Sequence, residues 1–232
     1  MNSNQRHFGI QRLMAISLLL TACTTKAAEK PPVATLRGLT LGATCQEVMI
    51  ELKSVAEKIN TKVLDGYHDA SGRLIQPCEK DSHGVISQPT IFRAIQGQIK
   101  DLIRASIDDS NKVDAISSET IWFESPGIAL PNKEALLEDL KNKYGDYWIK
   151  GRWTEDKGSV EAFMFPISAS NIAREGKPLS REDFEAKIEK AKGVFATAKI
   201  EASIGPQGIR LIRLKIDLES TKAQSAPKNI EL

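Results

Sequence analysis

Cysteine and histidine side chains are the groups of this chain best suited to chemistry, and the sequence has three of each. Cys45 and Cys78 make an even pair, as a disulfide requires. A metal site is the alternative, because His68 and His83 lie near Cys78 and the Cys78-x4-His83 spacing is loosely zinc-like. These spacings do not make a zinc-finger set. We therefore predict a Cys45–Cys78 disulfide, worth about 3.7 kcal/mol in the chain-entropy model, and no metal.

A histidine with an adjacent acid is the one pattern that suggests catalysis. In Tyr67-His68-Asp69, His68 could act as a base that Asp69 orients. The alternative is an exposed turn, which we favour because sequence neighbours point to opposite sides of a strand or splay apart in a loop. The sequence has no phosphate loop, H-E-x-x-H, G-x-S-x-G or dinucleotide motif. We predict no catalytic residue and no cofactor; the alternative is a hydrolase with a cryptic site in the 60–98 loop.

An aromatic residue and two cations form a candidate binding surface. Trp148, Lys150 and Arg152 alternate along an expected strand, opposite the face of Tyr147, Ile149 and Trp153. On an outer sheet face, such a set could hold a protein partner or a glycan. The alternative is a tryptophan covered by a loop or helix, with ordinary solvated charges beside it.

The first thirty residues have the composition of an export signal. A polar start with Arg6, His7 and Arg12 precedes an apolar run over residues 13–20. Eight helical residues reach only about 12 Å, far short of a bilayer core. The run ends in Leu20-Thr21-Ala22-Cys23, which resembles the lipobox of bacterial lipoproteins. The resemblance implies that residues 1–22 are removed and that Cys23 carries the lipid.

The resemblance also implies a place in the cell. Thr24, rather than Asp, follows the cysteine, which in that family implies sorting to the outer membrane. Residues 23–34 then form a lipidated tether, too polar to bury a core. The protein is expected on the periplasmic face, an oxidising space that favours the disulfide. The membrane is one expected partner, and an envelope protein or peptidoglycan is another.

Composition excludes several classes of protein. Hydrophobic residues make up 41% of the 232 residues, an ordinary share for a folded domain. No apolar run approaches the roughly 20 residues of a membrane span. Without residues 1–22 the chain has thirty basic and thirty acidic residues, because the leader contains Arg6 and Arg12 and no acid. This neutral balance gives no argument for nucleic-acid binding.

Hydrophobic periodicity predicts three repeats of a helix followed by a hairpin, the first with the 60–98 loop inserted. The helices are expected near 45–59, 132–144 and 181–192, and Thr44 and Glu47 form a capping-box pattern. Strands are expected over 36–41, 90–95, 99–107, 113–123 with a bulge near Ile116, 147–153, 160–167, 194–204 and 212–218. The predicted class is α+β: an antiparallel sheet built from hairpins with about three helices packed on one face. The folded domain is expected to cover 35–218. The alternative is two subdomains with a break near 124–131. Residues 219–232 are expected to be a flexible tail.

A second resemblance covers about ten residues. Leu39-Thr-Leu-Gly-Ala-Thr-Cys-Gln-Glu-Val48 looks like the G-x-(S/T)-x-x-E-V start of small periplasmic lipoprotein domains. Among these are the small lipoprotein of the outer-membrane β-barrel assembly machine and β-lactamase-inhibitor-like domains. The resemblance implies helices on an antiparallel sheet and a role as a binding module. We therefore expect an outer-membrane-anchored lipoprotein that acts as a non-enzymatic binding or scaffold module for envelope partners.

The Cys23→Ser variant tests the predicted anchor. We expect the native protein to incorporate radioactive palmitate, because lipidation requires the Cys23 thiol. The variant should incorporate none and should keep its leader. A native protein that takes up no label, or a variant that is processed and retained in the envelope as before, would contradict the prediction.

Overall fold

The computed structural model of the protein describes residues 34–155, 158–169 and 171–220. The expected leader, Cys23 and all but the last residue of the tether lie outside these residues. In the described residues, three α-helices accompany one large sheet and two small two-stranded sheets. The helices are α1 (Cys45–Lys58), α2 (Lys133–Tyr144) and α3 (Arg181–Glu189). The large-sheet strands are β5 (Thr90–Ile95), β6 (Ile99–Ile107), β7 (Val113–Phe123), β8 (Ile149–Glu155), β9 (Gly158–Pro166), β10 (Val194–Ile204) and β11 (Arg210–Ser220).

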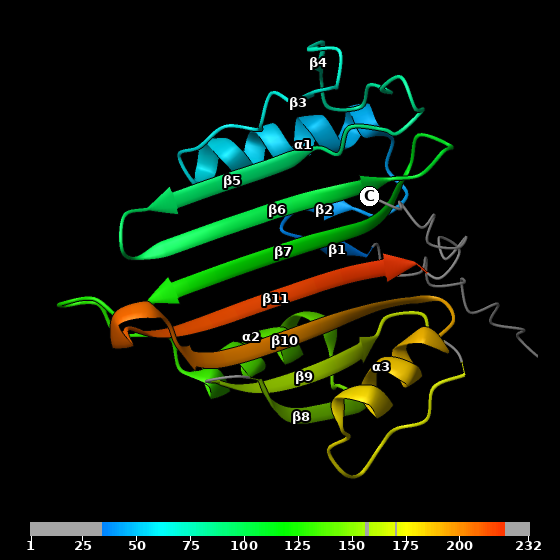
Figure 1. The fold of residues 1–232 in the computed structure, drawn as a ribbon. Coiled ribbons are helices and arrows are strands. Elements are labelled where there is room, and N and C mark those ends of the chain that lie inside the picture. Colours follow the sequence, from blue (N-terminus) through cyan, green and yellow to red (C-terminus); the bar gives the residue numbers. More distant parts are fainter. Residues whose placement is uncertain (1–33, 156–157, 170, 221–232) are drawn as a thin grey trace, which may run out of the picture. The chain divides into compact units, whose positions relative to one another are not determined.

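The large sheet is antiparallel throughout, in the order β5-β6-β7-β11-β10-β9-β8 (Figure 1). Strands β5, β6 and β7 form one half of the sheet. The chain then passes through α2 to β8 at the opposite edge, and β9, β10 and β11 follow inward until β11 pairs with β7. The α+β class built from hairpins is confirmed. Strands that precede residues 124–131 and strands that follow them pair in this one sheet, so the described residues do not form two separate sheets with a break there. Strand β11 extends to Ser220, two residues beyond the expected end of the domain.

One face of the sheet packs against α1 and α2. Helix α1 begins with a capping box: the Thr44 side chain accepts a hydrogen bond from the Glu47 N–H, and the Glu47 carboxylate accepts one from the Thr44 N–H at 2.8 Å. Its buried stripe meets the alternate apolar residues of the central strands. Helix α2 adds Leu140 to the same core. The buried strand residues include Ala196, Ala198, Ile200, Ile212, Leu214, Ile216 and Leu218.

Helix α3 packs on the opposite face, which corrects the expectation that the helices share one face. Phe184 of α3 is buried with Ala162 and Met164 of β9, whereas Phe163 and Phe165 belong to the core under α1 and α2. The physical reason is that β9 is apolar on both sides, so both sides must be covered. Gly151 on β8 allows the close approach, since a Cβ there would lie 3.0 Å from the Phe184 ring.

Two local expectations are corrected or refined by backbone conformation. Residues 36–41 form a hairpin of β1 (Thr35–Leu36) and β2 (Leu39–Thr40) rather than one strand. Arg37 and Gly38 have φ of 55° and 86°, and two successive left-handed residues make the tight turn of a two-residue hairpin. The bulge expected near Ile116 lies at Asp114, because Ser106 pairs with Ala115 and Ile107 pairs with Val113.

The predicted disulfide is formed between Cys45 in the first turn of α1 and Cys78, with Cα atoms 5.8 Å apart. It ties the irregular stretch between α1 and β5 to the core. That stretch includes the small hairpin of β3 (Tyr67–His68) and β4 (Leu74–Ile75). Among the described residues, no helix is both long and apolar enough to cross a membrane.

Removing the disulfide should destabilise the protein without changing its fold. In a Cys45→Ala/Cys78→Ala double variant, we expect the free energy of unfolding to fall by about 2–4 kcal/mol, because the unfolded chain regains loop entropy. Denaturant titration measures the loss. The reduced native protein is the matched control and should lose a similar amount. An unchanged denaturation midpoint in both samples would show that the bond contributes nothing.

Candidate functional site

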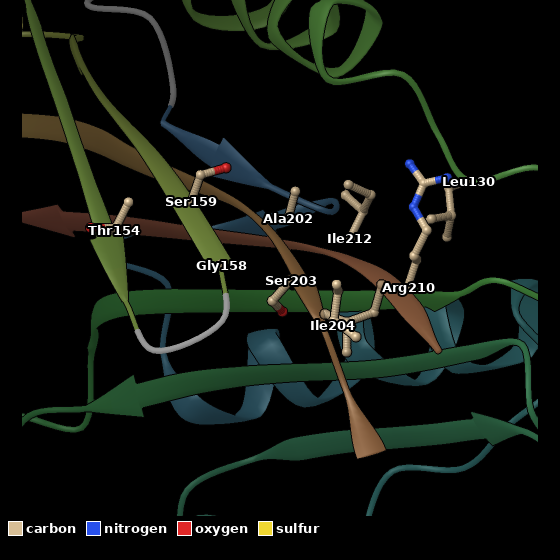
Figure 2. A pocket seen from close by; sticks show the side chains of 10 residues that line it. Leu130, Thr154, Gly158, Ser159, Ala202, Ser203, Ile204, Arg210 and Ile212 are labelled. Atoms are coloured by element: carbon tan, nitrogen blue, oxygen red, sulfur yellow. The ribbon is translucent and has the colours of Figure 1, made fainter. Parts of the chain in front are cut away.

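A cavity of about 430 Å³ opens at the end of the sheet where β10 turns back into β11 (Figure 2). Figure 2 shows that its lining side chains come from neighbouring strands and, with Leu130, from the segment before α2. The strand residues are Thr154 of β8, Gly158 and Ser159 of β9, Ala202, Ser203 and Ile204 of β10, and Arg210, Leu211 and Ile212 of β11.

Strand alternation places the cavity on the same side of the sheet as α1 and α2. Ala202 and Ile212 continue the apolar rows that α1 and α2 cover, and both contact that core. The two residues are direct neighbours across the β10–β11 pair. The cavity is therefore the open end of the apolar face, next to the first turn of α2.

Hydroxyl groups supply most of the polar chemistry of the cavity. Thr154, Ser159 and Ser203 all line it. The Lys133 ammonium, in the first turn of α2, donates a hydrogen bond of 3.2 Å to Ser159 Oγ. Ser203 Oγ donates to the Glu201 carboxylate at 3.0 Å. The Ser159 hydroxyl is thus held in place and keeps an acceptor lone pair for a ligand, whereas the Ser203 hydroxyl lies with Glu201 on the opposite face of β10.

Arg210 adds a positive charge at the rim. Its guanidinium Nη1 lies 3.7 Å from a Glu124 carboxylate oxygen, and the Arg210 side chain is 70% exposed. An ion pair this exposed is worth at most about 1 kcal/mol. The guanidinium is therefore available to a partner that brings an acceptor group to the rim.

One exposed isoleucine lines the same cavity, and two others are near its lining residues in sequence. Ile204, which lines the cavity, is 51% exposed. Ile209, in the turn between β10 and β11, and Ile128, in the segment between β7 and α2, are also exposed. Scattered exposed apolar residues are ordinary, but a half-exposed isoleucine in the lining of a cavity gives a partner an apolar surface to bury. The arrangement can bury an apolar group and hydrogen-bond a polar one; nothing in it requires a metal.

The structure separates the three residues of the sequence-based binding surface. Lys150 and Arg152 both bind Glu161, at 3.0 Å and 2.7 Å, and Lys150 also lies over the Phe163 ring. Trp148 instead packs against the α3 cluster. Tyr147 does not share a face with Ile149 and Trp153, because its ring contacts Phe163. The strand begins at Ile149, so alternation cannot be extended back to Trp148.

Asp69 and Asp81, the acids near His68 and His83, stabilise turns. The Asp69 carboxylate accepts hydrogen bonds from the Ser71 hydroxyl and from the backbone N–H groups of Ser71 and Arg73. The Ser71 hydroxyl first, and then the backbone bonds, lower the pKa of Asp69. The Asp81 carboxylate likewise accepts hydrogen bonds from the backbone N–H groups of His83 and Val85. His68 and His83 are both exposed. Tyr67 and His68 form the exposed strand β3 and only Asp69 belongs to the turn that follows, so the expected exposed turn is confirmed in its exposure but not in its conformation. The hydrogen bonds of the Asp69 carboxylate go to Ser71 and Arg73 and not to His68.

The metal alternative loses its thiol ligand. Cys78 is bonded to Cys45, so it cannot join His68 and His83 around zinc. In the part of the chain that the structure describes, no three His, Cys, Asp or Glu residues gather closely enough to hold a metal ion.

Comparison with protein-family models, with curated proteins and with solved structures finds no match to this chain.

Sequence reasoning missed the cavity, although one signal pointed to it. Ile204 is the last apolar residue of its strand and stands directly before the Gly205–Gly208 turn. An apolar side chain at a strand tip has little core to pack against. What the sequence does not contain is the position of Leu130 and Ser159 at the same cavity. Ser159 is placed there by the pairing of β9 with β10, and Leu130 by the course of the chain between β7 and α2.

Glu161 should stabilise the sheet edge in a pH-dependent way. Burial raises the pKa of Glu161, but hydrogen bonds from Lys150 and Arg152 outweigh it and lower the pKa overall. The stabilisation is therefore present above the ordinary value of 4.5 and is lost as pH falls through the lowered pKa. We expect Glu161→Gln to reduce the free energy of unfolding by up to about 1 kcal/mol at neutral pH.

Denaturant titrations at neutral and acidic pH measure this difference. The deficit of Glu161→Gln should shrink as pH falls below 4.5. Glu138→Gln is the control, because Glu138 is exposed and lies 3.8 Å from a single lysine; it should change stability less. A deficit of Glu161→Gln that is the same at both pH values would contradict the role of the ion pairs.

Proposed function

We propose that this protein is a lipid-anchored protein of the bacterial envelope, and that its folded domain is a non-enzymatic binding module for an envelope protein. The leader with Leu20-Thr21-Ala22-Cys23 supports the anchor. The Cys45–Cys78 disulfide supports an oxidising compartment such as the periplasm. With Thr24 after the lipidated cysteine, the proposed location is the periplasmic face of the outer membrane.

The observation that carries the binding function is the cavity at the end of β8–β11. Its polar groups are hydroxyls and an arginine, which recognise a partner through hydrogen bonds, and its apolar lining includes the half-exposed Ile204. Protein interfaces combine an apolar centre with polar groups in this way, and arginine is enriched in them. Ile204 is the residue that a partner would bury.

A crosslinker placed at the cavity tests this function. A photo-reactive phenylalanine analogue at position 204 of the full-length protein should give a discrete crosslinked species in living cells, because the side chain projects where the partner binds. Mass spectrometry of that species identifies the partner. The same analogue at position 50 is the matched control, since Ile50 is 71% exposed on α1 and does not line the cavity.

Two results would contradict the proposal. One is the same set of crosslinked species from positions 204 and 50, which would indicate random collisions. The other is the absence of any crosslinked species from position 204 when the protein is folded and located in the envelope. An Ile204→Ser variant should abolish the crosslinked species from a second analogue placed at Ile209, and it should do so with little loss of stability because Ile204 is half exposed.

A further inference from the structure

A second cavity, of about 600 Å³, lies on the opposite side of the sheet, between α3 and the outer face of β10 and β11. The α3 side contributes apolar Phe184 and Ile188 and three glutamates, Glu182, Glu185 and Glu189. The strand side contributes Thr197, Lys199, Asp217 and Glu219. We refer to this cavity as the acidic groove.

The acidic groove has a surplus of carboxylates. Five carboxylates line it and Lys199 is the one cation among its lining residues. Glu185 is already shared by Arg181 and Lys199, and Asp217 is paired with Lys215 at 3.0 Å. Within the described residues, no lysine or arginine lies within 4.0 Å of the carboxylates of Glu182, Glu189 and Glu219. These three leave the groove negatively charged.

Folding disfavours the charged form of Glu219. Burial, followed by the neighbouring carboxylates of Asp217 and Asp114, raises the pKa of Glu219 above its ordinary value, although Lys215 lowers it. Oδ1 of Asp114 is itself buried and has no hydrogen-bond partner in the described part of the chain. A cation that entered the groove would favour the charged form of Glu219 and relieve this repulsion.

An unpaired hydroxyl on the floor of the groove is independent evidence for a polar ligand. Thr197 is only 8% exposed and lines the groove, yet its hydroxyl makes no hydrogen bond to any residue that the structure describes. The hydroxyl is not one of the fully buried side-chain atoms that lack a partner, so it opens into the groove, where a ligand can reach it. Thr197 can accept a hydrogen bond from an ammonium or guanidinium group.

We propose that the acidic groove binds a basic peptide segment of a partner protein, whose lysine or arginine heads reach Glu189, Glu219 and Thr197 while their stems lie on Phe184 and Ile188. Glu182 and Glu189 are seven residues apart on α3, about 10 Å along the helix. Charges spread over this distance suit an extended chain with several cationic groups better than one compact cation. Long basic side chains bury their stems on apolar surface and keep their charged heads on the polar groups.

This inference rests on the proposed binding function, for which it names a class of partner, and not on the lipid anchor. The acidic groove and the cavity beside Ile204 lie on opposite faces of the sheet, so the two sites can be tested separately. A failure of peptide binding at the groove leaves the crosslink at position 204 as evidence for the binding function. A failure of that crosslink leaves the groove measurement unaffected.

A fluorescent peptide that alternates lysine and leucine is the probe, titrated into the purified full-length protein at low salt. We expect saturable binding that weakens strongly with added salt, and no binding of a peptide that alternates glutamate and leucine. A Glu189→Gln/Glu219→Gln variant should bind the basic peptide about tenfold more weakly. The matched control is Glu57→Gln/Glu138→Gln, which changes the net charge equally at exposed glutamates away from the groove.

Stability measurements separate a binding role from a structural one. A carboxyl whose pKa is raised by folding destabilises the charged protein at neutral pH, so Glu219→Gln should raise the denaturation midpoint while it weakens binding. Thr197→Val should likewise weaken binding several-fold without loss of stability, because it replaces an unpaired hydroxyl by a methyl group of the same shape. Simultaneous loss of binding and stability would assign both residues a structural role and overturn the proposal.

Two further outcomes decide against the proposal. Equal loss of affinity in the two double variants would mean that the peptide responds to net charge alone. The chain also continues beyond Ser220 with Lys222 and Lys228, close in sequence to Glu219. A large gain in affinity on deletion of residues 221–232 would assign the groove to the protein's own terminal segment, whereas unchanged affinity supports a separate partner.

Discussion

Two-sided burial of β9 is the constraint on which the rest of the structure depends. Four consecutive residues, Ala162 to Phe165, are fully buried, and they alternate between two separate cores. A strand without a solvent-exposed face must be packed on both sides, and here α2 packs on one face of the sheet and α3 on the other. Because β9 lies between β8 and β10, this choice also fixes which faces of those strands are buried. The positions of both cavities result from this arrangement. The cavity beside Ile204 lies next to the first turn of α2 on one face of the sheet, and the acidic groove lies beside α3 on the other face.

The two faces consequently present different chemistry. On the α1 and α2 side, the uncovered end of the sheet is apolar with hydroxyl groups, and Ile204 stands exposed at its edge. On the α3 side, the uncovered strip of β10 and β11 carries the polar members of the same alternating strands, among them Thr197, Asp217 and Glu219. Burial next to like charges raises the pKa of Glu219, which costs stability at neutral pH. Unrelieved costs of this kind are concentrated at binding sites, where a ligand removes them.

The irregular stretch between α1 and β5 is held by local bonds rather than by a core. The disulfide fixes it at Cys78, and Asp69 and Asp81 each fold a turn by accepting hydrogen bonds from backbone N–H groups two and four residues later. Asp108 does the same in the β6–β7 turn. This repeated use of aspartate explains why acids stand beside His68 and His83 without any catalytic arrangement. Aspartate is common both in turns and in catalytic sites, so an aspartate near a histidine in the sequence does not by itself indicate catalysis.

The sequence alone determined the elements with strong local signals: the capping box at Thr44, the stop at Gly145, the last hairpin and the pairing of the two cysteines left in the folded part. It determined them because caps, turns and period-two alternation are local and need few distant contacts. Tertiary structure alone decided that α3 crosses to the other face, that Trp148 separates from Lys150 and Arg152, and that Ser159 meets Lys133 beside Ile204. Those outcomes depend on which strands become neighbours, and strand order is a property of the whole sheet that no short segment contains.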